Sequence, residues 1–82
     1  MSYQYKTNGV CSRSIFFDLD EGLVRNVRFE GGCNGNLQGV ARLAEGRPAT
    51  EVASVLSGIC CDSKPTSCPD QFARALRGVL QP

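Results

Sequence analysis

The sequence contains no histidine and no tryptophan among its 82 residues. Without histidine the chain cannot form a Ser-His-Asp or Cys-His catalytic group, and a transition-metal site must use cysteine thiolates, alone or with carboxylates. The formal charge is nearly balanced, at +1 from nine basic and eight acidic residues. We therefore expect neither duplex nucleic acid nor an anionic membrane as a binding partner.

Long hydrophobic runs are also missing. No stretch approaches the length of about 18 apolar residues that a membrane span needs. The segment from Met1 to Lys6 lacks the basic and apolar regions of a secretory signal. We expect a single domain over residues 1–82 in the cytoplasm, where thiols stay reduced and more often bind metal or do redox chemistry than form disulfides.

Five cysteines are present, although none belongs to a Cys-x-x-Cys pair. Each lies at a predicted boundary between elements, where loop side chains can converge on a metal ion. Four thiolates would form a tetrahedral site that strengthens a small core. The spacing alone leaves open that the thiols are inert and buried, or that they are redox-active. The five are Cys11, Cys33, Cys60, Cys61 and Cys68.

Alternating hydrophobic residues predict a short antiparallel sheet. We expect an edge strand over Tyr3 to Thr7, followed by strands over Ser14 to Asp20 and Leu23 to Glu30. The turn Asp20-Glu21-Gly22 joins the last two strands into a hairpin. The apolar stripe predicted for the last strand consists of Leu23, Val27 and Phe29.

The hydrophobic period then becomes helical. The first predicted helix has Asn36 as its N-cap and stops at Gly46, and the second begins at Pro48 and ends near Gly58 or Ile59. In the third, Cys68 is the N-cap before Pro69, where the helix dipole favours a thiolate. Strands followed by helices predict an α+β fold, in which a sheet of two to three strands is covered on one face by about three helices. The predicted helical stripes are Leu37, Val40, Ala41 and Ala44; Val52, Val55, Leu56 and Ile59; and Phe72, Ala73, Leu76, Val79 and Leu80.

A glycine-rich loop lies between the last strand and the first helix. Backbone N–H groups in such a position can bind phosphate, which makes the loop a candidate nucleotide contact. It matches neither the P-loop nor the GxGxxG pattern, so a tight turn that lets Cys33 point inward is the favoured interpretation. The candidate contacts are Gly31, Gly32, Asn34, Gly35 and Asn36.

The string Lys64-Pro65-Thr66-Ser67-Cys68-Pro69-Asp70-Gln71, with the glycine-rich loop upstream, resembles the TSCPD domain family. The resemblance extends from Cys11 to about Leu76 and is closest to the small single-domain bacterial members. It implies that Cys11, Cys33, Cys61 and Cys68 bind a metal, with zinc or iron as the candidates and Cys60 as the spare thiol.

The same domain occurs at the C-terminal end of adenosylcobalamin-dependent ribonucleotide reductases. The resemblance therefore implies an accessory role in nucleotide reduction, with a protein partner such as that reductase, because 82 residues cannot hold the catalytic barrel itself. Three functions remain open at this point. They are a zinc-binding interaction module, a thiol redox carrier that uses Cys61 and Cys68 or Cys60 and Cys61, and a nucleotide-binding domain.

Overall fold

A two-residue turn closes the central hairpin of the protein. The computed structural model describes residues 1–10, 12–32, 34–61 and 63–80. Strand β2 (Ser12–Asp20) pairs antiparallel with β3 (Leu23–Gly31), and Glu21 and Gly22 connect them with φ angles of 52° and 80°. Positive φ at both turn residues matches the right-handed twist of the flanking strands, which confirms the predicted hairpin.

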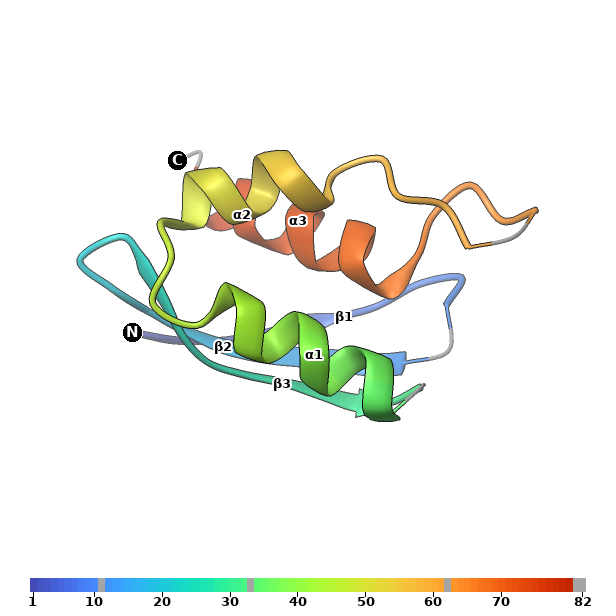
Figure 1. Cartoon of the computed structure of the whole chain (residues 1–82), viewed down its shortest axis with the longest axis horizontal. Coiled ribbons are helices and arrows are strands. Elements are labelled where there is room, and N and C mark those ends of the chain that lie inside the picture. Colours follow the sequence, from blue (N-terminus) through green and yellow to red (C-terminus); the bar gives the residue numbers. More distant parts are fainter. Residues whose placement is uncertain (11, 33, 62, 81–82) are drawn as a thin grey trace.

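Strand β1 (Ser2–Lys6) completes the sheet by pairing antiparallel with β2. Within the described residues the sheet has three strands in the order β1-β2-β3. Figure 1 shows the helices on one side of this sheet. The predicted strands are confirmed, with bounds that differ by one or two residues.

A β-bulge at Asn26 changes which side chains of β3 face the core. Asn26 has a φ of 53°, and the register with β2 shifts there by one residue, between Phe16 and Asp18. Its side-chain Nδ2 donates a 2.8 Å hydrogen bond to Oδ2 of Asp18. Because an extra residue reverses the alternation of a strand, Val24 is buried where the uninterrupted pattern predicted Leu23. The observed inner stripe is Val24, Val27 and Phe29.

Three helices cover the inner face of the sheet in the described part of the chain: α1 (Asn34–Ala44), α2 (Ala49–Leu56) and α3 (Cys68–Leu80). Helix α1 packs against β3, whereas α2 packs against α3. This arrangement confirms the predicted α+β fold. No helix among the described residues has the length and apolar character required to cross a membrane.

Two helix predictions were wrong in detail. Helix α1 begins two residues before the predicted N-cap, Asn36. Helix α2 ends at Leu56, because Ser57 has extended backbone and Gly58 a φ of 86°. With only two turns, α2 presents Val52 to the core but leaves Val55 exposed, although its spacing placed it on the buried stripe.

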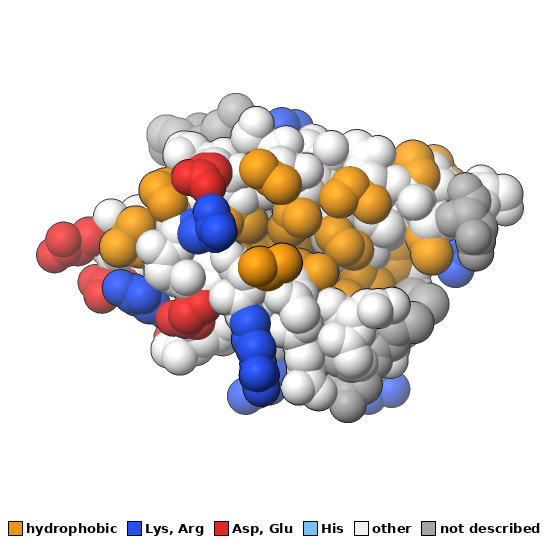
Figure 2. All heavy atoms as spheres, in the orientation of Figure 1, with side chains coloured by type: hydrophobic (Ala, Val, Ile, Leu, Met, Phe, Trp, Pro, Cys, Tyr) orange, Lys and Arg blue, Asp and Glu red, His pale blue; other side chains and the backbone are white. Residues whose placement is uncertain are grey.

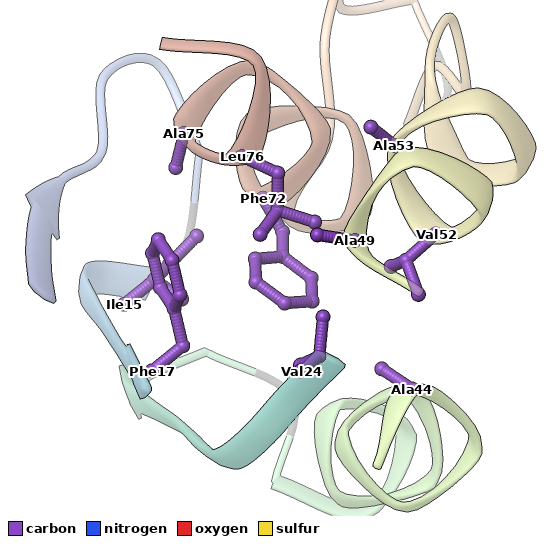
Figure 3. Close-up of a cluster of buried hydrophobic side chains, with 10 residues drawn as sticks. All are labelled: Ile15, Phe17, Val24, Ala44, Ala49, Val52, Ala53, Phe72, Ala75 and Leu76. Atoms are coloured by element: carbon purple, nitrogen blue, oxygen red, sulfur yellow. The ribbon is translucent and has the colours of Figure 1, made fainter. Parts of the chain in front are cut away.

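The core lies between α3 and the hairpin. The ring of Phe72 meets the ring of Phe17 edge-on at a centroid distance of 5.5 Å and that of Phe29 at 5.9 Å. Figure 3 shows Phe72 projecting from α3 between Phe17 and Val24. All of these side chains except the partly buried Phe29 are excluded from water, so this cluster is the main hydrophobic contribution to stability.

Candidate metal centre

Helix α3 begins with a side-chain cap. The Oγ atom of Ser67 accepts a 3.1 Å hydrogen bond from the backbone N–H of Asp70, and its carbonyl accepts a 2.8 Å bond from the N–H of Gln71. Ser67 is therefore the N-cap and Cys68 the first helical residue, so the predicted Cys68 cap was wrong by one position. The reason is that a hydroxyl oxygen is a better acceptor for these N–H groups than a thiol.

The carboxylate of Asp70 joins the start of α3 to the loop that precedes it. Its oxygens accept hydrogen bonds from the hydroxyl of Thr66 at 2.5 Å and from the N–H of Gly58 at 2.7 Å, and the Nε atom of Arg74 lies 3.1 Å away. The hydrogen bond from Thr66 is the main cause that lowers the pKa of Asp70 below its ordinary value; burial opposes it, and the contacts with Gly58 and Arg74 assist. A charged carboxylate thus holds this region in place.

The loop after α2 folds back along the start of α3. The hydroxyl of Ser67 donates a 2.6 Å hydrogen bond to the carbonyl of Ile59. The N–H of Cys61 donates a 3.2 Å bond to the carbonyl of Thr66. These contacts place the backbone of Cys61 beside the residues that lead into Cys68, while the side chain of Cys61 is exposed.

The sulfur of Cys68 faces the first residue of β2. The Oγ atom of Ser12 donates a 3.1 Å hydrogen bond to Sγ of Cys68. Both residues are buried, with Cys68 only 9% exposed. This long-range hydrogen bond ties the start of β2 to the start of α3.

Gly32 brings a third segment to the same place. A Cβ atom at this position would lie 3.2 Å from the backbone nitrogen of Ser12 and 2.9 Å from Cδ1 of Leu37. Gly32 also has a φ of 86°, which other residues adopt only with strain. Glycine therefore permits the end of β3 to approach the start of β2 at the point where β2 contacts α3.

The structure describes three of the five cysteines and, for the other two, only their neighbours in the chain. Cys11 and Cys33 lie outside the described residues. Of the other cysteines, Cys60 and Cys61 are exposed and Cys68 is buried. Among residues 1–10, 12–32, 34–61 and 63–80, no three side chains of histidine, cysteine, aspartate or glutamate are grouped to hold a metal ion. The four-cysteine set stays a prediction.

Comparison with known protein families gives one match, over nearly the whole chain. A family model described as the TSCPD domain matches residues 1–80. The chain belongs to the TSCPD domain family. No curated protein and no solved structure matches it significantly.

In this TSCPD domain, four of the five residues that give the family its name build the start of α3. Thr66 and Asp70 bond to each other, Ser67 caps the helix, and Pro69 occupies a first-turn position where no N–H is required. Only the side chain of Cys68 takes no part in the helix start, and its sulfur contacts β2. The motif therefore fixes the start of the helix, while the thiol of Cys68 contacts the neighbouring strand.

The glycine-rich loop follows β3 and precedes α1 in the chain. Gly31 ends β3 and has a φ of 81°, and Gly32 makes the close approach described above. Asn34 begins α1, and Gly35 and Asn36 are exposed in its first turn. Gly31 and Gly32 thus turn the chain at the end of the strand. The expected inward direction of Cys33 lies outside the described residues, and nucleotide binding in this loop stays a prediction.

Sequence reasoning missed two polar residues around this centre. The only signal for Ser12 is its place beside Cys11, because its contact with Cys68 spans 56 residues. Gln71 is buried, accepts a hydrogen bond from the N–H of Asn8 at 3.3 Å and donates one to Thr66 at 3.0 Å. The contacts of Ser12 with Cys68 and of Gln71 with Asn8 span 56 and 63 residues, so periodicity cannot reveal them.

Proposed function

We propose that this TSCPD domain is a metal-binding accessory module in which four cysteine thiolates hold one zinc ion. The ligands would be Cys11, Cys33, Cys61 and Cys68. The ion would join the start of β2, the end of β3 and the start of α3 into one unit. Zinc bound by four thiolates has no open position for substrate, so the role of the metal would be structural.

The observation that carries the proposal is the hydrogen bond from Ser12 to Cys68, with Gly32 packed against Ser12. One peptide bond links Ser12 to Cys11 and another links Gly32 to Cys33. Consecutive Cα atoms are about 3.8 Å apart. Two predicted ligands are therefore direct chain neighbours of Ser12 and Gly32, and Ser12 contacts the third predicted ligand, Cys68. Convergence of distant segments on one buried thiol is what a four-cysteine site requires.

The donor chemistry fits zinc. Four thiolates carry four negative charges, which a divalent cation neutralises only in part, and the remaining charge needs nearby donors. The Ser12 hydroxyl is one such donor, and the N-terminal end of α3 contributes further positive potential. Iron also accepts four thiolates, so elemental analysis has to decide between the two metals.

A metal would also meet a physical need of this small domain. A chain of 82 residues buries a limited hydrophobic core, and domains near this size often need a metal or disulfides to reach ordinary stability. Cys11 and Cys68 lie near opposite ends of the chain, so a bond through a metal would restrict the unfolded state strongly.

The proposed accessory role is supported by the family resemblance and not by a catalytic site in the structure. The family resemblance associates this domain with adenosylcobalamin-dependent ribonucleotide reductases, and we propose an enzyme of nucleotide reduction as the protein partner. The domain would act by association, in the cytoplasm, with the metal holding its recognition surface in shape.

The test is elemental analysis of protein purified under reducing conditions without chelator, together with single replacements of each cysteine by serine. We expect about one zinc per chain. Cys61→Ser should lose the metal and the cooperative unfolding transition, as should replacement of the other three ligands. Cys60→Ser is the matched control, because Cys60 is adjacent to Cys61, is also exposed and lies outside the proposed ligand set. A stable, metal-free wild type would overturn the proposal.

A thiol redox carrier is the second candidate, and the exposure of Cys60 and Cys61 favours it. Two adjacent accessible thiols could each lose one electron and one proton to a disulfide partner, which would be reduced to its dithiol. The burial of Cys68 disfavours the Cys61–Cys68 pair, since exchange needs access to the sulfur. Cys60→Ser separates the candidates, because a redox carrier would lose electron transfer and a zinc module would not.

A further inference from the structure

An apolar groove separates α1 from α2 on the helical face. The groove exists because α1 packs on β3 while α2 packs on α3, which leaves the two helices apart. Its volume is about 270 Å³. Figure 2 shows hydrophobic side chains gathered over this part of the surface. The apolar lining includes Val40, Leu43, Val52, Val55 and Leu56.

Large apolar side chains at this groove are exposed to solvent. Leu43 on α1 is 70% exposed and Val55 on α2 is 68% exposed, and Ile59 just beyond α2 is 41% exposed. Single exposed hydrophobic residues are ordinary, but a continuous apolar surface with a hollow centre is typical of an interaction site. The groove is open and lined mainly by aliphatic side chains, which suits a protein surface better than a polar small molecule.

The rim of the groove carries one charge of each sign. The guanidinium of Arg47 lies 3.0 Å from the carboxylate of Glu51, and both side chains are about half exposed. The Nε atom of Arg47 also donates a 2.7 Å hydrogen bond to the carbonyl of Leu43 at the end of α1. The arginine is therefore held in position at the rim rather than extended into solvent.

We propose that this groove is the interface of a homodimer, with a second copy of the chain seated on it about a two-fold axis. A two-fold interface is self-complementary. If one residue of the first copy contacts a second residue of the other copy, the reverse contact is made as well. A two-fold axis close to Arg47 and Glu51 would set Arg47 of each copy against Glu51 of the other. The balanced charges at the rim thus match a second copy, while a strongly charged partner would find no net charge of opposite sign there.

The helical face is large enough for such an interface. The molecule measures 35 × 23 × 19 Å along its principal axes, and Figure 2 views the face spanned by the two longer ones. A standard interface covers about 800 Å² per partner, roughly one sixth of the 5046 Å² surface of this chain. Arg47 and Glu51 would lie near the two-fold axis, with the exposed apolar side chains of Leu43 and Val55 buried beside them. The proposal does not depend on the metal.

Sedimentation velocity of the purified protein over a range of concentrations tests this inference. We expect a dimer that dissociates on dilution. Arg47→Glu and Glu51→Arg should each weaken dimerisation by about tenfold or more, since each places like charges opposite one another in the homodimer. An equimolar mixture of the two variants should restore the dimer, because one chain then carries two acidic and the other two basic side chains at the rim. Val55→Asp should abolish dimerisation both in the otherwise wild-type chain and in the mixture of the two charge variants.

The matched control is the exposed ion pair between Arg13 and Glu30 on the sheet, with an N–O distance of 3.6 Å. Arg13→Glu makes the same charge change away from the groove and should leave dimerisation unaltered. Circular dichroism should show that every variant is folded. A wild type that stays monomeric up to about 0.5 mM would overturn the proposal and leave the groove to a different protein. A dimer that survives both Arg47→Glu and Val55→Asp would overturn it as well.

Discussion

The hydroxyl of Ser12 donates a 3.1 Å hydrogen bond to the sulfur of Cys68, which joins the first residue of β2 to the first residue of α3. The two residues are 56 positions apart in the chain, and both are buried. In the proposed zinc site, this donor would partly neutralise the Cys68 thiolate and fix its orientation without touching the metal.

Replacing this hydroxyl tests that relationship. Ser12→Ala should lower zinc affinity by about tenfold to a hundredfold, because the Cys68 thiolate loses its donor, while the methyl group left in place preserves packing. Competition with a chromophoric chelator measures the change. Ser14→Ala alters a second buried serine of the same strand and should leave the affinity unchanged. Equal effects of the two replacements would show that Ser12 acts only through packing.

The close approach at Gly32 predicts an unusually costly glycine replacement. Gly32→Ala should destabilise the domain by about 2 to 4 kcal/mol, since positive φ strain adds to a clash with Leu37 and the backbone of Ser12. Gly22→Ala is the matched comparison, because Gly22 also has positive φ but its Cβ would meet no atom within 4 Å. It should cost about 1 kcal/mol. Urea denaturation gives both values, and equal losses would exclude a contribution from the contact.

The carboxylate of Asp70 makes stability depend on acid pH. Its pKa is lowered in the folded protein, chiefly by the hydrogen bond from Thr66, so the unfolded state takes up a proton first as the pH falls. The stabilisation is complete at neutral pH and declines below about pH 4, where an unfolded aspartate becomes protonated. It is lost fully only below the folded pKa.

Asp70→Asn should therefore destabilise the protein by about 1 to 3 kcal/mol at pH 7 and by progressively less below about pH 4. Denaturant unfolding at several pH values measures this difference. Asp20→Asn removes an exposed carboxylate next to the hairpin turn and serves as the control, with little effect at any pH. A difference between wild type and Asp70→Asn that did not change with pH would contradict the assignment.

Phe72 is the side chain on which the core depends most. Phe72→Ala should cost about 3 to 5 kcal/mol, because it removes a fully buried ring that contacts both Phe17 and Phe29 edge-on. That loss approaches the whole stability of many small domains, so Phe72→Leu, at about 1 to 1.5 kcal/mol, keeps the effect measurable. Thermal unfolding compares them with Phe16→Ala on the opposite face, where Arg28 lies over the ring at 4.7 Å. A smaller loss at Phe72 than at Phe16 would be inconsistent with this core.

The sequence by itself determined the parts of the fold that have local causes. The Glu21-Gly22 turn, the alternating strands on either side of it and the helix stop at Gly46 each follow from a few neighbouring residues. The motif from Thr66 to Asp70 likewise indicates the TSCPD family from the sequence alone, because its residues are adjacent in the chain.

Tertiary structure alone decided the features that depend on distant contacts. The bulge at Asn26 is held by Asp18 on the neighbouring strand, and it reversed the alternation that made Leu23 look like a core residue. Val55 has the spacing of a buried residue but is exposed, since the elements beneath α2 determine which of its faces is covered. The contact of Ser12 with Cys68 requires the whole fold. A local sequence pattern reflects the secondary structure that its residues favour, whereas burial and contacts depend on which distant segments pack beside them.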